Sequence, residues 1–553
     1  MNRIFHRTIL ICLLVLATGV FVAAFQSQIS PVSLTRGQSV AVSCAESDIS
    51  IKPTSARRAI FSCVPSAIPS PTVTPTPTPT PTPVPTPTPT PTPSPSGSPA
   101  EMPRVLLDSR MPTQAGIVRE VLAGNSLQAA INAAQPGDII SLQAGATFTG
   151  NFILPQKTGA GWILIRSSAL VSLPEGVRVA PSNASAMARI VAQDTTPAIS
   201  TAPGAAFWRL AGLEITGPSQ ITTLVRLGDW AATNQAANAS EIGIDRCWIH
   251  GTATSEMRRG VELQGARMFV VDSYLSDFHQ TQTDSQAICG WNGAGPFKIV
   301  NNHLEAASEN LLFGGADPKT QGLIPSDIEI RRNYFYKPLA WTGKDWNLKF
   351  SFELKNAQRV WVDGNILENC WPSPSGGGTA FALKSVNQEG GCAWCRTGDL
   401  TVTNNVVRNA AQGVSLLGTD ASQPGVKMTR VLLRNNVFDT TGAYWAYVEE
   451  VHDTSIIGNT INNADSILQA DNLPSQRFIC TDNAFARVGQ YGIKGAGAGS
   501  GTATLNLFFP GYQFVRNVLL GANPAEYPAG NYLVATPGTG ADMALILAAQ
   551  QRP

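Results

Sequence analysis

The chain has 553 residues, of which only 14% are charged, and its formal net charge at pH 7 is +1. This near-neutral balance argues against the basic footprint of a nucleic-acid-binding protein and against a polyacidic binder, so we expect no nucleic-acid partner. The 49 glycines and the scarcity of long helical patterns indicate many short strands joined by turns.

The N-terminus has the pattern of an export signal. Arg3 and Arg7 precede an apolar run from Thr8 to Phe25, and Val22-Ala23-Ala24 offers small residues for cleavage. The alternative is an uncleaved membrane anchor, because a run of about 18 residues is just long enough to span a bilayer. We therefore expect residues 1–25 to be a signal peptide or anchor. The body should be secreted or held in the cell envelope, with membrane contact only if this segment is retained.

Two further segments precede the body. Residues 26–66 alternate like short strands and contain Cys44 and Cys63, so we expect a small disulfide-stapled β unit. Residues 67–100 are a nearly pure Pro-Thr repeat. Proline fixes the φ angle and lacks an amide proton, so this linker should stay extended, reaching about 90 Å at ~3.1 Å per residue. Such a spacer would hold the body away from a surface or a neighbouring module.

The body, residues 101–553, opens with an amphipathic segment over 126–134 and a strand over 139–142. A short helix before the first strand shields the end of an open parallel stack from water and from edge pairing, so we expect an N-terminal capping helix. At the other end, the apolar spacing within 538–551 predicts a short closing helix.

A repeat of the form apolar-x-apolar-x-x-Asn-x-apolar fills the region between these ends. Residues 328–335 align with 360–367 in this frame, and about ten copies recur with anchors about 23 to 40 residues apart. The pattern is that of a strand, a bend at Asn and a second strand. Each copy has one apolar face that it cannot bury alone, so the copies should stack as coils with strands about 4.8 Å apart.

The repeated asparagine predicts a buried ladder. It occupies the same place in seven consecutive copies: Asn302, Asn333, Asn365, Asn405, Asn436, Asn459 and Asn483. Stacked amides can bond to the coils above and below, which satisfies polar groups at a buried corner. The alternative, that these residues mark exposed turns, explains the flanking core residues less well. We predict an all-β fold, a right-handed parallel β-helix of about ten or more coils.

By this coil repeat and Asn ladder, residues 120–553 resemble the pectate-lyase-like right-handed β-helix proteins. The resemblance concerns the fold more than the activity, because this architecture carries lyases, hydrolases, adhesins and phage tailspikes. It also implies that the strand after the Asn bend forms, with its loops, the face that binds sugar chains. In this sequence that strand falls over 260–264, 310–314, 351–355, 380–384 and 413–417.

Alternation in those strands predicts which side chains leave the core. Glu353, Lys355 and Lys384 should point outward, with the two lysines at equivalent positions of adjacent coils. Two close ammonium groups disfavour each other's charge, so Lys355 could act as a base for the C5 proton of a uronic acid while Lys384 binds its carboxylate. Glu353 could add an acid. The alternative is that both lysines are simply solvated.

Other polar residues could complete this site. Gln264 should point outward on an earlier coil, Asn387 follows Lys384, and Asp317 in a nearby turn could hold a calcium ion. No other cofactor is indicated. The segment 384–387, Lys-Ser-Val-Asn, is close to the Lys-Ser-x-x-Asn motif of chondroitinase-B-like and alginate lyases, but it has one residue fewer before the Asn.

Long insertions beside the same coils carry four candidate sugar-binding residues: Trp341, Trp346, Trp371 and Trp394. Exposed Trp rings stack on sugar rings, and loops on a rigid scaffold concentrate binding residues. The alternative is that these rings pack inward over the coil edges. A separate aromatic file on another face is expected to be a packing stripe under a loop; its members are Trp248, Tyr274, His303 and Tyr334.

Eight of the nine cysteines lie outside the signal. The pair in Cys392-Ala-Trp-Cys395 could suggest a zinc half-site or a redox pair, but it has no second pair and no His partner. We expect a loop disulfide or free buried thiols instead.

The leading hypothesis is an exported carbohydrate-active protein, a polysaccharide lyase acting on a uronic-acid polymer. The alternative is a non-catalytic cell-surface adhesin or structural glycan-binding module, which the Pro-Thr linker suits equally well. Glycoside hydrolysis is less favoured, because Glu262 and Glu353 share a face but lie several coils apart. The expected partner is a polysaccharide or cell-surface glycan, and the expected oligomeric state is a monomer.

Overall fold

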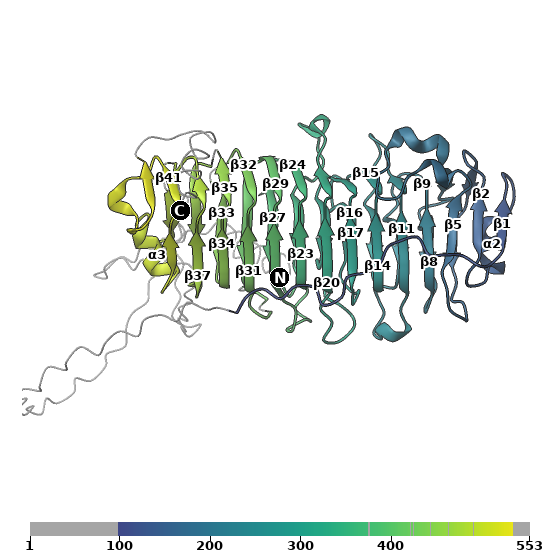
Figure 1. The fold of residues 1–553 in the computed structure, drawn as a ribbon, viewed down its shortest axis with the longest axis horizontal. Helices are drawn as coiled ribbons and strands as arrows, with labels where there is room; N and C mark the ends of the chain where they lie inside the picture. The colour runs from purple at the N-terminus through teal and green to yellow at the C-terminus, as the bar shows by residue number, and fades with distance from the viewer. Residues whose placement is uncertain are drawn as a thin grey trace, which may run out of the picture. The chain divides into compact units, whose positions relative to one another are not determined.

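The structure, a computed structural model, describes residues 98–534 apart from 374–375, 421, 424, 443, 463 and 490–491. The expected signal or anchor, the β unit with Cys44 and Cys63, nearly all of the Pro-Thr linker and the closing helix over 538–551 lie outside the described residues and stay predictions. Within them the chain winds through three long sheets, here called A, B and C, whose neighbouring strands are parallel (Figure 1).

Sheet A has 14 strands. In order of pairing they are β1 (Val118–Val121), β2 (Ile139–Leu142), β5 (Ile163–Ser167), β8 (Ala206–Ala211), β11 (Ser240–Asp245), β14 (Ala266–Val271), β17 (Phe297–Val300), β20 (Ser326–Arg331), β23 (Ala357–Asp363), β28 (Thr397–Thr403), β31 (Thr429–Arg434), β34 (His452–Ile457), β37 (Phe478–Thr481) and β40 (Gln513–Val515).

Sheet B also has 14 strands. They are β3 (Thr147–Thr149), β6 (Ala188–Val191), β9 (Leu213–Thr216), β12 (Trp248–His250), β15 (Tyr274–Phe278), β18 (His303–Ala306), β21 (Tyr334–Tyr336), β24 (Ile366–Cys370), β29 (Val406–Ala410), β32 (Val437–Thr440), β35 (Thr460–Asn462), β38 (Ala484–Phe485), β41 (Val518–Leu520) and β42 (Tyr532–Val534).

Sheet C has 12 strands. They are β4 (Phe152–Leu154), β7 (Ile199–Thr201), β10 (Thr223–Leu227), β13 (Arg259–Leu263), β16 (Gln286–Gly290), β19 (Glu309–Phe313), β22 (Phe350–Leu354), β27 (Thr379–Lys384), β30 (Gln412–Leu417), β33 (Ala446–Glu449), β36 (Ser466–Ala470) and β39 (Gly492–Gly495). A small antiparallel pair, β25 (Pro372–Ser373) and β26 (Gly376–Gly377), forms a hairpin in one loop.

From β2 to β39, each coil contributes one strand to each sheet in the order A, B, C. Thus β17, β18 and β19 form one coil, and β20 begins the next by pairing with β17. The pairing of Ile328 with Val360 and of Ile330 with Val362 is the register that the repeat predicts. The predicted parallel β-helix is therefore confirmed.

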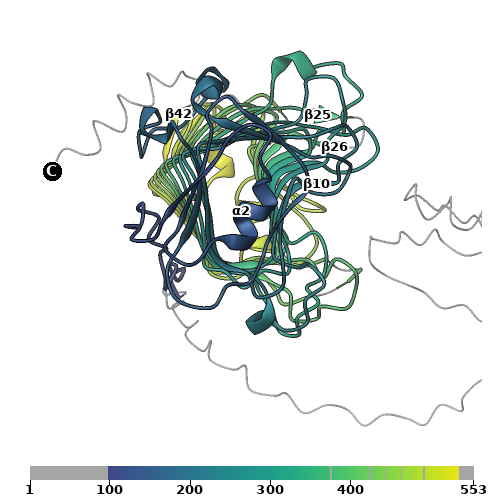
Figure 2. The same ribbon diagram turned by 90° about the vertical axis from the view of Figure 1, so that its right-hand side faces the viewer.

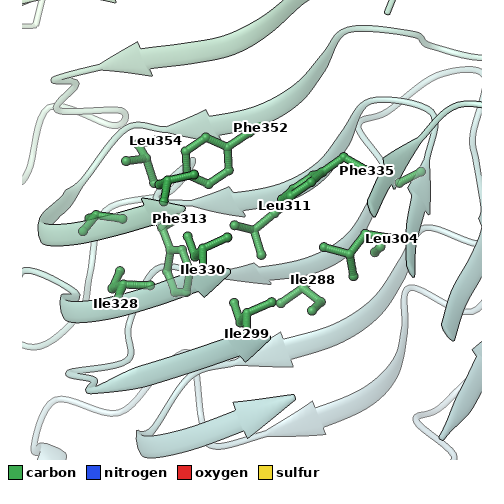
Figure 3. Packing of buried hydrophobic residues seen from close by; sticks show 14 of the residues in the cluster. Ile288, Ile299, Leu304, Leu311, Phe313, Ile328, Ile330, Phe335, Phe352 and Leu354 are labelled. Atoms are coloured by element: carbon green, nitrogen blue, oxygen red, sulfur yellow. The ribbon is translucent and has the colours of Figure 1, made fainter. Parts of the chain in front are cut away.

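The inward side chains of the three sheets fill one continuous core. Ile330, Phe335 and Phe352, one from each sheet, are at most 1% exposed and belong to the same cluster. Figure 3 shows these residues pointing into the interior from strands on different sides of the coil. Because no coil could bury these groups alone, stacking is what removes them from water.

The asparagine ladder lies at the corner between sheets A and B, as predicted. In each step the main-chain amide and Nδ2 of one Asn donate to Oδ1 of the next, at 2.9 and 3.0 Å from Asn302 to Asn333. All seven predicted members take part and are at most 1% exposed. The structure adds Asn517 and Asn531 at the C-terminal end of the ladder. Ser273 takes the equivalent position before Asn302: its Oγ accepts from the main-chain amide of Cys247, and its own amide donates to Oδ1 of Asn302.

The residue before each ladder Asn makes the bend. It has a left-handed backbone in consecutive coils, with φ of 59° at Asn301, 53° at Arg332, 64° at Gly364 and 56° at Asn404. Asn and Gly tolerate this conformation best, and Arg332 departs from that preference.

The two described helices lie at opposite ends of the coil stack. α2 (Leu127–Ala133) is capped by Ser126 and buries Leu127 and Ile131 in the main core. Figure 2 shows α2 across the interior at the N-terminal end. α3 (Thr502–Phe508) buries Leu505 and Phe508 near β39. The loops of the described region contain five short 3-10 helices: η2 (Leu170–Ser172), η3 (Pro181–Ala186), η4 (Gln235–Ala237), η5 (Leu339–Trp341) and η6 (Pro524–Glu526).

The segment 98–112 crosses the outer face of sheet A as an extended strap (Figure 1). The main-chain amide of Glu101 donates to Asp399 of β28 (3.1 Å), and that of Arg104 donates to Asp327 of β20 (2.9 Å). The strap is therefore bonded to coils that lie 223 and 298 residues further along the chain.

Substituting one ladder member should weaken the whole stack. In Asn405→Ala, the main-chain amide and Nδ2 of Asn365 lose the acceptor they share (2.9 Å each). Buried groups left without partners cost about 1–3 kcal/mol each, so we expect a loss of about 2–5 kcal/mol in the free energy of unfolding by urea. Arg434→Ala, at an exposed position of β31, should change it by less than about 0.5 kcal/mol. Equal effects of the two substitutions would contradict a stabilising ladder.

Candidate functional site

The two predicted lysines lie side by side on sheet C. Leu354 pairs with Leu383 at the ends of β22 and β27, so the residues that follow, Lys355 and Lys384, occupy equivalent places on adjacent coils. Their side chains are 18% and 20% exposed. Both ammonium groups are therefore held at the surface of the sheet and can be reached from solvent.

Glu353 lies between these lysines. Its side chain is only 2% exposed, with Oε1 2.7 Å from Nζ of Lys384 and Oε2 3.8 Å from Nζ of Lys355. The Lys384 ammonium also lies 4.3 Å from the centroid of the Phe350 ring. The spacing of the two lysines in the sequence predicts only repulsion between their ammonium groups. The shared carboxylate offsets that repulsion and holds the three side chains as one cluster, here called the Lys-Glu-Lys cluster.

Glu309, which the sequence analysis did not single out, lies next to this cluster. It pairs with Phe350 of the following coil and is fully buried. Its Oε2 accepts a hydrogen bond from Gln286 (2.7 Å), while Oε1 has no partner in the described structure. Burial, with added repulsion from Glu353 and Asp284, raises the pKa of Glu309 to about 8. This carboxyl is therefore mainly protonated at neutral pH.

The strand frame explains why Glu309 was missed. The expected strand began at residue 310, whereas β19 begins one residue earlier. The column that contains Glu309 also contains Arg259 and Gln286 at the same register. A polar residue stands at the start of three successive strands, and this pattern in the sequence could have identified Glu309.

An ion pair extends the charged surface beyond Glu309. Nζ of Lys349 lies 2.6 Å from Oδ1 of Asp284, and the Asn347 amide donates to the same Asp284 oxygen (2.9 Å). Acids and bases thus lie on four neighbouring coils, in or next to β16, β19, β22 and β27.

Two of the predicted polar residues, Gln264 and Asn387, hold loops in place. Oε1 of Gln264 accepts from the amides of Trp291 and Asn292 (3.2 and 3.0 Å), and Oδ1 of Asn387 accepts from the amide of Cys392 (2.7 Å). Gln264 is fully buried. To bind a sugar, either side chain would have to give up these hydrogen bonds to the loop.

Asp317 is the predicted calcium ligand. Its carboxylate oxygens accept from the amides of Glu389 (3.1 Å) and Gly391 (2.8 Å), and the residue is 5% exposed. No group of three or more His, Cys, Asp or Glu side chains in the described residues is arranged to hold a metal ion. The observed role of Asp317 is to fix the loop after β27.

The loop after β27 is closed by a disulfide between Cys392 and Cys395, as one of the two sequence interpretations predicts. Cys247, Cys289, Cys370 and Cys480 are buried free thiols. Because the loop starts directly after Lys384, the disulfide and Asp317 together restrict the surroundings of the Lys-Glu-Lys cluster.

The four predicted tryptophans pack at least partly against the protein. Trp341 is 4% exposed and clusters with Ala307 and Leu348, and Trp346 and Trp371 pack against the same cluster. Trp346 stacks on His279 with ring centroids 4.0 Å apart. Nε1 of Trp394 donates to the carbonyl of Leu323 (3.1 Å). This arrangement favours the alternative that these rings cover the coil edges.

The carboxylates considered for hydrolysis are far apart. Glu262 and Glu353 occupy one outward column but are separated by β16 and β19. Three strand spacings amount to about 14 Å, more than the roughly 5–9.5 Å between the paired carboxyl groups of glycosidases. Glu262 is also held by Arg226 (3.0 Å) and Arg259 (2.9 Å). This pair does not support glycoside hydrolysis.

Parallel sheets, a single core and an unbroken amide ladder together define a parallel β-helix protein, here with a charged cluster on sheet C. A sequence model of the family described as periplasmic copper-binding protein (NosD) matches residues 347–531, about a third of the chain. No curated protein matches the sequence significantly.

Three solved structures illustrate the similarity in fold. They are an alginate lyase from a Paenibacillus species (14% identity, 64% of this chain and 98% of the other, TM-score 0.37), the catalytic unit of an α-1,3-glucanase from Streptomyces thermodiastaticus (11%, 75% and 65%, 0.41) and PfbA, a surface adhesin of Streptococcus pneumoniae (12%, 64% and 85%, 0.40). At these identities and TM-scores the similarity concerns the fold alone.

The donor set in the matched region does not suit copper. Residues 347–531 contain one histidine, His452, and four cysteines. Two of these cysteines form the disulfide, and Cys370 and Cys480 are buried, which raises the pKa of both thiols. Copper sites use converging imidazole, thiolate and thioether ligands, and in the described part of the chain no three His, Cys, Asp or Glu side chains converge to hold a metal ion.

Helices within the described residues do not meet the length and apolarity that a membrane span requires.

Replacing Glu309 by Gln should change how stability depends on pH. An unfolded Glu releases its proton near pH 4.5, whereas the folded carboxyl keeps it up to about pH 8. Between these values the folded state binds more protons, so the wild-type free energy of unfolding falls as pH rises. Gln does not ionise, so the stability of Glu309→Gln relative to wild type should rise across this window by up to ~1.4 kcal/mol per pH unit.

Urea unfolding at several pH values measures this difference. Glu120→Gln, at an exposed position on β1, is the control and should follow wild type. If the curves for Glu309→Gln and wild type run parallel from pH 4.5 to 8, the buried carboxyl is not protonated.

Proposed function

We propose that this protein is an exported carbohydrate-active β-helix protein that cleaves a uronic-acid polymer by β-elimination on sheet C. The observation that carries the proposal is the Lys-Glu-Lys cluster: two partly exposed ammonium groups on adjacent coils that share the buried carboxylate of Glu353. Export rests on the N-terminal pattern of the sequence.

The chemistry of β-elimination explains why such a cluster is suited to it. A base removes the proton from C5 of a uronic acid, and a cation at the C6 carboxylate stabilises the developing charge. The C4–O bond then breaks to leave an unsaturated sugar, and the departing oxygen takes up a proton from the protonated base or from water. Two lysines on adjacent coils can supply both the base and the cation at neighbouring positions of one sugar residue.

The distances favour different roles for the two lysines. Lys384 is held close to Glu353 (2.7 Å) and is suited to remain a cation that binds the substrate carboxylate. Lys355 is farther from that carboxylate (3.8 Å), so in its unprotonated form it is the better base. Glu353 positions both side chains, and the mainly protonated Glu309 avoids a second negative charge beside it.

Calcium is not needed to explain the described contacts. Both Asp317 oxygens already accept hydrogen bonds from main-chain amides. We therefore assign the cationic role at the substrate carboxylate to Lys384, and activity assays with and without calcium test this assignment.

A non-catalytic adhesin or structural glycan-binding module is the second candidate. The favouring observation is that Glu353 already pairs with both lysines. Such a cluster can also serve as a structural ion network in a protein that binds a glycan without cleaving it.

Activity against a panel of uronic-acid polymers, with and without calcium, tests the proposal. The lyase should produce unsaturated ends that absorb ultraviolet light. Lys355→Ala and Lys384→Ala should each lower the rate by about 100-fold or more without changing the unfolding midpoint by more than a few degrees.

Lys344→Ala, at an exposed position in the loop that carries Trp341, is the control and should keep full activity. Glycan binding without any new chain ends would favour the adhesin. Full activity of Lys355→Ala would exclude the lysine mechanism.

A further inference from the structure

A hollow lies on sheet B, on a different side of the coils from the Lys-Glu-Lys cluster. It has a volume of about 260 Å³ and is lined mainly by Arg178, Arg332, Tyr334, Ile366, Glu368 and Arg408. In the sequence, Tyr334 stands out only as a member of the aromatic file. That file is in register as predicted, with Trp248, Tyr274, His303 and Tyr334 paired along β12, β15, β18 and β21.

The coil register builds one wall of this hollow. Tyr334 pairs with Ile366, and the next outward column places Glu368 beside Arg408 on neighbouring strands. Arg332 stands at the left-handed bend just before ladder residue Asn333. The same corner that carries the ladder thus brings Arg332 into the lining of the hollow.

A long loop supplies another part of the wall. Arg178 lies between β5 and β6, yet it donates to the carbonyl of Asn301 (3.1 Å) and to that of Arg332 (2.7 Å). The same loop packs Leu170, Leu173 and Val179 in a cluster that contacts Trp248 and Tyr274. The first part of the aromatic file is therefore covered, whereas Tyr334 faces the hollow.

The hollow carries an excess of positive charge. Its only carboxylate is Glu368, which accepts from the Tyr334 hydroxyl (3.1 Å) and lies 3.7 Å from Arg408. Arg178 bonds to uncharged oxygens. Arg332 is exposed and has no carboxylate within salt-bridge distance among the described residues. Three guanidinium groups thus face one carboxylate, which favours an anionic ligand.

The rigid ring of Tyr334 adds an apolar surface to this charge. Its ring centroid lies 5.4 Å from that of His303, and His303 stacks on Tyr274 at 3.9 Å. These contacts between rings fix the orientation of Tyr334, so the side chain loses little conformational entropy when a ligand binds. An aromatic face beside guanidinium groups suits a sugar ring that bears a carboxylate.

We propose that this hollow is a second glycan-binding site, which takes a carboxylate-bearing sugar residue of an acidic polysaccharide. Arg332 and Arg408 bind the carboxylate and Tyr334 contacts the ring. The site does not depend on the proposed lyase activity: it would hold an acidic glycan against sheet B even if sheet C cleaves nothing.

Binding is best measured in the full chain carrying Lys355→Ala and Lys384→Ala, so that the lysines on sheet C do not contribute. The probes are hexasaccharides of polyuronic acids, a neutral hexasaccharide and inorganic sulfate, with affinities measured by calorimetry. Arg332→Asn and Arg408→Gln remove the two outer charges. Asn suits the left-handed bend, since Asn301 and Asn404 occupy it in other coils.

We expect a uronic-acid hexasaccharide to bind this background protein and the affinity to fall about tenfold for each of the two substitutions. Arg434→Ala, an exposed arginine of sheet A, should leave the affinity unchanged. In the protein with intact lysines, Arg332→Asn and Arg408→Gln should leave the turnover of a short substrate unchanged. This result separates the site on sheet B from the proposed function of sheet C.

Three outcomes would overturn the proposal. They are unchanged affinity in both arginine variants, equal affinity for the neutral hexasaccharide, and sulfate binding as tight as that of the uronic-acid hexasaccharide. Circular dichroism of each variant checks that the coils remain folded.

Discussion

The buried chain of asparagine amides is the interaction on which the rest of the structure depends. Each amide bonds to the coil before and the coil after it, and the amides that pair are 14 to 40 residues apart in the sequence. A shift of one residue in any coil would leave both an amide oxygen and a main-chain amide without partners in a dry corner, so the ladder fixes the register of all three sheets. The adjacency of Lys355 and Lys384 follows from this register.

Sheet C shows how a regular scaffold becomes a chemical site. Parallel stacking brings outward side chains within one strand spacing of each other, and neighbouring columns then combine charges of opposite sign. Glu353 joins two lysines, while Glu309 is buried beside it with a pKa raised to about 8. The loop held by Asp317 and the Cys392–Cys395 disulfide limits how far this cluster can relax. The site therefore depends on burial and on loop anchoring as much as on the lysines themselves.

Outward side chains of successive coils form columns on sheet B as well as on sheet C. Sheet B places tyrosine and arginine side chains in columns, and the loop between β5 and β6 brings Arg178 to the same hollow. Columns of this kind run along the axis of the stack, which suits a linear polymer with a repeated charge. The proposed binding on sheet B and the proposed chemistry on sheet C can thus be separate properties of one scaffold.

Periodicity in the sequence alone determined the coils, the seven predicted ladder members, the inward Phe and Leu residues of sheet C and the placement of the lysines, because each depends only on a repeated spacing. Tyr512, Phe514, Asn517 and Leu519 fit the same frame and could have extended the ladder. Tertiary structure decided what the spacing could not: the carboxylate between the lysines, the protonated Glu309, the inward packing of Trp341 and the reach of Arg178. These features depend on how loops of unequal length fold back on the coils, and a one-dimensional repeat carries no information about those contacts.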